Sequence, residues 1–81
     1  MDEIKVLCRF VQEHKIADMY QLMTVKPKDI RVGDIVAIAP ACYDDLGYQA
    51  QFVDKIKVGK YLVINGFVFD PEADEPIMRR I

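Results

Sequence analysis

The stretch Lys60-Tyr61-Leu62-Val63-Ile64-Asn65-Gly66-Phe67-Val68-Phe69 decides the fold. Asn-Gly supplies two residues that tolerate positive φ, which a two-residue type I′ turn requires, and both flanks are strongly β-prone. The stretch therefore predicts a β-hairpin. The side chains expected to face the core lie on one side of the ribbon: Leu62, Ile64, Phe67 and Phe69. The other side carries Tyr61, Val63, Val68 and Asp70.

The residues before the hairpin, 50–58, alternate between apolar and polar side chains well enough to predict a half-buried strand. The side chains expected to point inward are Ala50, Phe52, Ile56 and Val58. Those expected to point to water are Gln51, Val53, Lys55 and Lys57. A turn at Gly59 joins this strand to the hairpin, which gives a meander of three strands.

Two further strands are predicted on either side of the meander. Pro27 and the charged residues after it, followed by Val-Gly-Asp at 32–34, indicate a loop that leads into a strand at 35–38. In this turn the Asp34 side chain can accept hydrogen bonds from backbone N–H groups. Pro76 can stand at the entrance of a last strand, 77–81, where no ladder N–H is needed.

Residues 1–25 fit two interpretations. No Gly, Pro or Asn interrupts the segment, and two sets of apolar side chains have helical spacing: Ile4, Leu7, Cys8 and Val11, and then Ile16, Met19, Tyr20 and Met23. The same segment also alternates as a strand, and 20–25 would then run straight into the Pro27 loop. A β-hairpin is favoured over a helix because the later elements are all strands and a barrel needs its edges covered. The lack of ordinary turn residues at 12–15 is the main objection to it.

These elements predict a mainly β fold, a small SH3-like barrel of five or six short antiparallel strands. The chain has 81 residues, which is enough for one small domain, 1–81, with a modest core. No repeat, low-complexity tract or linker divides it.

Composition excludes several classes of function. The net charge is −2, from 13 acidic and 11 basic side chains, whereas nucleic-acid-binding proteins usually carry a clear basic excess. The sequence has no Ser and only one His, which excludes a Ser–His–Asp triad and a metal site built mostly of imidazoles. The four glycines are too widely spaced for a dinucleotide or P-loop fingerprint. The sequence therefore predicts no enzyme activity, cofactor or small-molecule substrate.

The compartment is predicted from the two cysteines, Cys8 and Cys42. An extracellular domain of this size would usually carry more disulfides, so we expect structural thiols in a reducing cytoplasm. Asp2 and Glu3 stand where a signal peptide would be basic, and no apolar run approaches the roughly 20 residues that span a bilayer. The sequence predicts a soluble cytoplasmic protein with no membrane contact.

The segment 40–48 is the most site-like loop in the sequence. Paired carboxylates such as Asp44 and Asp45 can bind a divalent cation or act as acid and base. However, the Asp-x-Asp-x-Asp-Gly spacing of calcium loops is missing, and neighbours on an extended chain point apart. We expect solvated carboxylates there, and a surface position for His14, whose spacing from the cysteines matches no compact zinc pattern. The loop also carries Tyr43 and Tyr48, which are candidates for contact with a partner.

Two hypotheses of function remain. Apolar residues exceed what a small barrel can bury, which favours a protein-binding module whose partner is either another protein or a second copy of itself in a homo-oligomer. The candidate partner-binding residues are Tyr61, Val63, Val68, Tyr43 and Tyr48. The N-terminal segment could instead simply cover the second face of the meander. The other hypothesis is a nucleic-acid-binding barrel with a basic face made of Lys26, Lys28, Arg31, Lys55, Lys57 and Lys60. Interspersed aspartates weigh against it.

Overall fold

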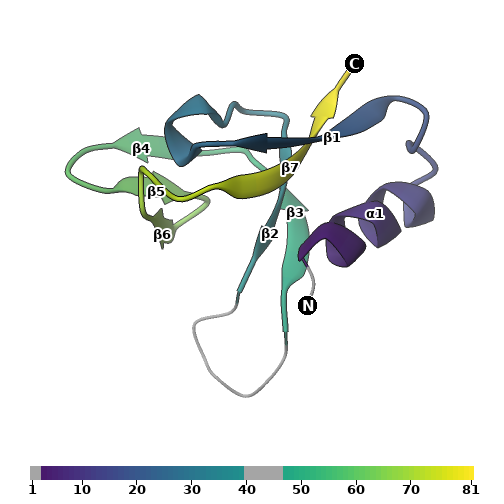
Figure 1. The fold of residues 1–81 in the computed structure, drawn as a ribbon, viewed down its shortest axis with the longest axis horizontal. Helices are drawn as coiled ribbons and strands as arrows, with labels where there is room; N and C mark the ends of the chain where they lie inside the picture. Colours follow the sequence, from purple (N-terminus) through teal and green to yellow (C-terminus); the bar gives the residue numbers. More distant parts are fainter. Residues whose placement is uncertain (1–2, 40–46) are drawn as a thin grey trace.

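The computed structural model describes residues 3–39 and 47–81, which form one helix and two antiparallel sheets (Figure 1). The elements in chain order are α1 (Glu3–Glu13), β1 (Tyr20–Val25), the 3₁₀ helix η1 (Pro27–Asp29), β2 (Ile35–Ile38), β3 (Gln49–Phe52), β4 (Ile56–Val58), β5 (Leu62–Ile64), β6 (Phe67–Phe69) and β7 (Glu75–Arg80). The sheets have the orders β1-β7-β2-β3 and β4-β5-β6. The mainly β class is confirmed. The described strands do not close into a barrel, so the SH3-like arrangement is not confirmed.

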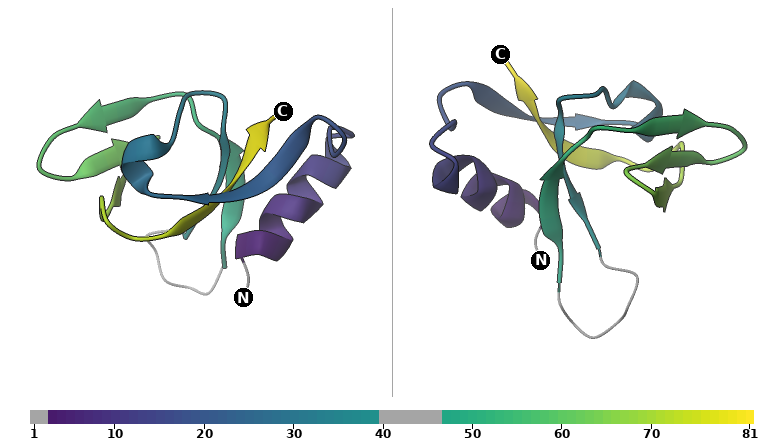
Figure 2. Two further views of the ribbon diagram at one scale, coloured as in Figure 1. Left: turned by 45° about the horizontal axis from the view of Figure 1, so that its top comes forward. Right: turned by 180° about the vertical axis from the view of Figure 1, so that it is seen from behind.

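The four-stranded sheet is covered on both faces (Figure 2). On one face, α1 packs Leu7 and Val11 against Ile35 and Ala37 of β2. On the other face, the alternate residues of β2 share a core cluster with the three-stranded sheet and the η1 loop; its fully buried members are Ile30, Val36, Ile38, Val53, Ile64 and Ile77. Because β2 lies between two apolar layers, all four of its side chains are buried.

The N-terminal segment is a helix over Glu3–Glu13, so the favoured hairpin is wrong for these residues and the helical alternative is confirmed. The helix ends in a Schellman motif, in which Ile16 N–H donates to Val11 O and Lys15 N–H donates to Gln12 O. Lys15 takes the left-handed position, with φ 58°, that glycine usually fills. The missing turn signal at 12–15 therefore reflects a helix end made without glycine. The strand at 20–25 is confirmed as β1.

The Asn-Gly hairpin is confirmed in its predicted register, with Ile64 opposite Phe67 and Leu62 opposite Phe69. Asn65 and Gly66 have φ of 52° and 88°, as a type I′ turn requires. The Asn65 side chain also forms hydrogen bonds with residues outside the turn. Its Oδ1 accepts hydrogen bonds from the N–H groups of residues 54 and 55, and its Nδ2 donates to Gln51 and to the carbonyl of Phe52. One residue thus closes the hairpin and ties it to the bend between β3 and β4.

The predicted strand 50–58 is wrong as a single element, because it divides at that bend into β3 and β4 of different sheets. The two residues at the break have the opposite orientation from the prediction. Val53, expected in water, is 1% exposed, and Phe52, expected in the core, is 42% exposed. Val58, also expected inside, is 84% exposed. Where the chain passes from one sheet to the other, the alternation of inward and outward side chains does not continue in phase. The apolar–polar pattern of the sequence cannot reveal this change.

The turn into β2 forms as predicted. The Asp34 carboxylate accepts a hydrogen bond of 2.9 Å from the Arg31 backbone N–H. The last strand, β7, also forms, and it begins at Glu75, so Pro76 lies within it rather than before it. Pro76 is opposite Thr24 of β1, the outermost strand on that side of the four-stranded sheet.

Candidate functional site

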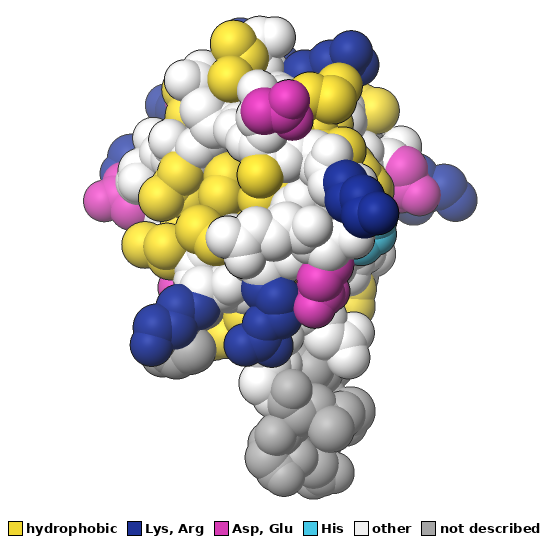
Figure 3. Space-filling view, turned by 90° about the vertical axis from the view of Figure 1, so that its right-hand side faces the viewer, with side chains coloured by type: hydrophobic (Ala, Val, Ile, Leu, Met, Phe, Trp, Pro, Cys, Tyr) yellow, Lys and Arg dark blue, Asp and Glu magenta, His cyan; other side chains and the backbone are white. Residues whose placement is uncertain are grey.

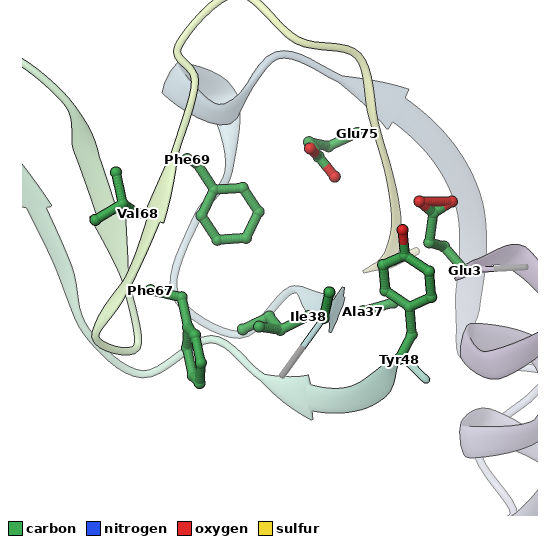
Figure 4. Close-up of a pocket in the computed structure, with 9 residues that line it drawn as sticks. Glu3, Ala37, Ile38, Tyr48, Phe67, Val68, Phe69 and Glu75 are labelled. Carbon is green, nitrogen blue, oxygen red and sulfur yellow. The ribbon is translucent and has the colours of Figure 1, made fainter. Parts of the chain in front are cut away.

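The most site-like feature of the described residues is an open cavity of about 380 Å³ where α1 meets the two sheets (Figure 4). Its lining comes from the start of α1, the end of β2, the residue before β3, β6 and the start of β7. The lining residues are Glu3, Ala37, Ile38, Ala39, Tyr48, Phe67, Val68, Phe69 and Glu75. Five separate chain segments therefore meet at this place.

Seven of the nine described lining residues have aliphatic or aromatic side chains. Phe67 and Phe69 are half-buried residues of β6 that pack against the core on the inner side of the hairpin. Figure 4 shows Phe69 on one side of the cavity and Tyr48 on the other, with Ile38 and Ala37 between them. The alternation of β6 turns Val68 away from the Phe69 side (Figure 4). Val68 thus contributes to the outside of the rim.

The polar groups of the cavity are two carboxylates and a phenol. Figure 4 shows the Tyr48 hydroxyl directed toward the Glu3 carboxylate. The negative charge of Glu3, and the hydrogen bond that the Tyr48 hydroxyl donates to it, raise the pKa of Tyr48. Burial at the cavity wall, and next the charge of Glu3, raise the pKa of Glu75. The three groups therefore act on one another electrostatically.

The sequence-predicted partner residues separate into three places. Tyr48 and Val68 both line the cavity. Val63 lies opposite Val68 on the outer face of the hairpin but is half-buried. Tyr61, two residues before Val63, is exposed, and the Lys60 ammonium lies 5.9 Å from its ring centroid. Tyr43 lies outside the described residues. The structure thus places two of the five predicted residues, Tyr48 and Val68, in the cavity lining, together with aromatic and acidic side chains that the sequence did not indicate.

Sequence reasoning missed Glu3 and Glu75 as site residues. Each lies near one end of the chain, in a segment whose charged side chains are typical of solvent-exposed surface. Strand β7 pairs with β2, and α1 packs on both strands, which places the two glutamates at the same end of the four-stranded sheet. No local motif could have signalled this, because the site depends on contacts between distant segments.

Five of the six predicted basic residues are exposed, and the sixth, Lys26, is half-buried. Lys26 is paired with Asp74 at 2.7 Å, and the hydrogen bond from its ammonium raises the pKa of Lys26. The loop after η1 does pack beside β4, since Ile30 and Ile56 share a core cluster. The remaining basic candidates, all exposed, are Lys28, Arg31, Lys55, Lys57 and Lys60.

A second open cavity, also of about 380 Å³, lies on the β1 and β7 side of the molecule. It contains Arg31, Arg79 and Arg80 together with Tyr20. The Arg79 guanidinium is already held by the Asp34 carboxylate, at 2.9 Å. The lining of this cavity therefore includes the Asp34–Arg79 ion pair as well as the side chains of Arg31 and Arg80.

Part of the apolar surplus is buried, while Met19, Tyr61 and Val68 stay exposed. Leu7 and Val11 are buried, and Met23 packs against the core. Seen from the α1 side, hydrophobic side chains form a patch bordered by charges of both signs (Figure 3). The exposed large apolar residues of α1 and of the region around β1 include Ile4, Met19 and Leu22.

The remaining candidates have ordinary surroundings. His14 follows the last residue of α1, stacks on Phe10 at a centroid distance of 4.0 Å and has Nδ1 at 2.8 Å from the Phe10 carbonyl oxygen. Cys8 is half-buried and packs against the core cluster that contains Leu7 and Val11. Cys42, Asp44 and Asp45 lie outside the described residues. Within ranges 3–39 and 47–81, no group of three or more His, Cys, Asp or Glu side chains is placed to hold a metal ion. Nor does any helix there have the length and apolar character to cross a membrane.

Comparison with known protein families, with curated proteins and with solved structures finds no match to this chain. The geometry of the cavity and the chemistry of its lining are therefore the basis of the functional argument.

Proposed function

We propose that this protein is a non-catalytic interaction module whose cavity and rim bind a segment of a partner protein. The observation that supports this most directly is the cavity itself. Its lining combines aromatic and aliphatic side chains with two carboxylates and a phenol, and binding pockets likewise combine apolar walls with converging polar groups. Its volume of about 380 Å³ lies within the common range for such pockets.

The rim supports binding of a polypeptide rather than of an enclosed small molecule. Val68 is 67% exposed and Tyr48 is 37% exposed, so both can contact a ligand that extends beyond the cavity. Tyrosine and large apolar residues contribute much of the contact energy in protein interfaces. A bound segment would place one side chain in the cavity and lie across these two residues.

The proposal is tested with a pair of charge substitutions. Val68→Lys places a charge at the rim, whereas Val58→Lys makes the same change at an 84% exposed valine that does not line the cavity. Proteins retained by immobilised wild type, by each variant and by bare resin would be quantified from the native host. We expect at least one protein retained by wild type and by Val58→Lys but lost with Val68→Lys. Equal retention by both variants contradicts the proposal.

A second copy of the chain is one partner that this proposal allows. Light scattering of wild type over a range of concentrations measures self-association directly. If the partner is a second copy, the mass should rise with concentration for wild type and for Val58→Lys, and stay at the monomer value for Val68→Lys. Val68 is a better choice than Val63 for this test because Val63 is half-buried, and a lysine there would disturb the sheet itself.

The nucleic-acid alternative has one observation in its favour, the packing of the η1 loop beside β4. Titration with a single-stranded oligonucleotide at two salt concentrations separates the two functions. Phosphate contacts through residues such as Lys28, Arg31 and Lys57 would give an affinity that falls steeply with salt. If the protein is an interaction module, the Lys28→Gln/Lys57→Gln variant should bind the oligonucleotide no more weakly than wild type does.

A further inference from the structure

The charges of the cavity are unbalanced. Two carboxylates, Glu3 and Glu75, line it, and none of the described lining residues is Lys, Arg or His. The segment 40–46, which follows Ala39 in the sequence, is Pro-Ala-Cys-Tyr-Asp-Asp-Leu and contains no basic side chain either. A cavity with this balance attracts a cation, because its field is of one sign and its apolar walls weaken screening by water.

The aromatic walls suit the same kind of ligand. The faces of aromatic rings carry partial negative charge and attract ammonium and guanidinium groups. Phe69 and Tyr48 stand on opposite sides of the cavity, with Glu75 between them at its upper edge in Figure 4. A cation between the two rings would meet both kinds of attraction, from the rings and from the carboxylate.

The aliphatic part of the cavity favours a long side chain over a bare ion. Ile38 lines the cavity and belongs to the core cluster against which Phe67 and Phe69 pack, so it provides an apolar surface for the methylene groups of a lysine or arginine. A bare divalent cation needs several oxygen ligands, and the described residues hold no group of three acidic or other metal-binding side chains. The lining thus matches an organic cation with an apolar stem.

We propose that the cavity receives a basic side chain, lysine or arginine, from the partner protein. This inference rests on the proposed function, since it names the group by which the partner would be recognised. The electrostatics of the cavity agree with it. Burial and the neighbouring Glu3 charge raise the pKa of Glu75, and a bound cation would relieve this penalty by stabilising the carboxylate.

The test compares two small probes that differ in the ammonium group. N-acetyl-lysine methylamide carries the cation, and N-acetyl-norleucine methylamide carries a similar apolar stem without it. Each would be titrated into isotope-labelled protein, and NMR shifts of Tyr48, Phe69 and Glu75 would be followed. We expect the lysine probe to saturate these shifts in the millimolar range and the norleucine probe to bind about 5-fold more weakly, a difference at the upper end for a partly exposed charge pair.

A double variant and a matched control connect the binding to the carboxylates. In Glu3→Gln/Glu75→Gln the preference for lysine over norleucine should disappear. Glu13→Gln removes one negative charge from the other end of α1, where the residue is exposed and outside the cavity lining, and should keep the preference. Dispersion of the amide spectrum confirms that each variant is folded. Equal binding of the two probes to wild type, or no binding of either, overturns the inference.

The two proposals can fail separately. Equal binding of both probes, together with loss of a partner in Val68→Lys, would keep the interaction module and remove the basic side chain. A lysine preference that depends on the two glutamates, with equal retention of proteins by Val68→Lys and Val58→Lys, would support the cationic cavity and remove the proposed polypeptide contact across the rim.

Discussion

Asp34 and Arg79, 45 residues apart, are joined by two hydrogen bonds, from Arg79 Nε to Asp34 Oδ1 at 3.1 Å and from Nη2 to Oδ2 at 2.9 Å. The Asp34 side chain is 4% exposed and that of Arg79 is 16% exposed. The same guanidinium donates to the carbonyl of Asp29, and the same carboxylate accepts from the Arg31 N–H. The pair thus fastens β7 to the turn that begins β2.

Breaking this pair should be costly. Asp34→Asn or Arg79→Met leaves the other group partly buried without its partner, so we expect each to lower the free energy of unfolding by about 2–4 kcal/mol. The double variant should lose at least about 1 kcal/mol less than the sum of the two, because no unpaired charge remains. Urea unfolding of the four proteins measures the cycle. Additive losses would mean that the two side chains act independently.

The hairpin turn gives a second prediction, with a control in the same chain. Gly66 has φ 88°, and a Cβ built on it would meet nothing within 4 Å, so Gly66→Ala should cost about 1–2 kcal/mol through backbone strain alone. Gly59 does not have positive φ, and a Cβ there would meet only the Tyr61 carbonyl, at 3.8 Å. Gly59→Ala should change stability by less than about 0.5 kcal/mol. Thermal melts that move equally for both variants would contradict this account.

Asn65 is predicted to contribute more than its turn conformation. Asn65→Gly keeps a residue that accepts positive φ but removes the side-chain hydrogen bonds to the β3–β4 bend. At about 0.5–1.5 kcal/mol for each bond, and with some replaced by water, we expect a loss of about 1–3 kcal/mol. Hydrogen exchange should also speed up at the amides of Asp54 and Lys55, which donate to Asn65 Oδ1. Unchanged exchange at these two amides would count against the bridging role.

The helix end offers a stabilising substitution. Lys15 holds φ 58° in the Schellman motif, a conformation that costs a non-glycine residue energy. Lys15→Gly should remove this strain and raise stability by about 0.5–1 kcal/mol, after the greater flexibility of glycine in the unfolded chain is allowed for. Calorimetry measures the change. The control is Lys5→Gly inside α1, which should be destabilising because glycine is a poor helix former.

The cavity carboxylates predict a pH effect whose sign follows from the Glu75 pKa. Folding raises this pKa, so the folded state holds the proton more tightly than the unfolded chain, and the charged carboxylate opposes folding at higher pH. Glu75→Gln should therefore raise stability near about pH 7, by no more than about 1 kcal/mol because the group is partly solvated. The gain should vanish near about pH 3, where both states are protonated. A gain of the same size at both pH values would show that charge is not its cause.

Sequence alone determined the elements whose structure is set by neighbouring residues. The Asn65–Gly66 turn fixes its own register through positive φ, and the strand at 35–38 and the Asp34 turn follow from a short apolar run and a local side-chain bond. The charge balance and the absence of serine, which rules out a Ser–His–Asp triad, are likewise read from composition. These features need no knowledge of where the rest of the chain lies.

Tertiary structure decided the features that depend on what covers each sheet. Residues 3–13 fit both a helix and a strand, and the uncovered face of the four-stranded sheet, where Leu7 and Val11 become buried, selects the helix. The reversal at Phe52 and Val53 arises because the chain passes there from one sheet to another. The cavity needs both events, since α1 supplies Glu3 and the second sheet supplies Phe69. Long-range packing sets both, because burial of apolar surface depends on segments far apart in the chain.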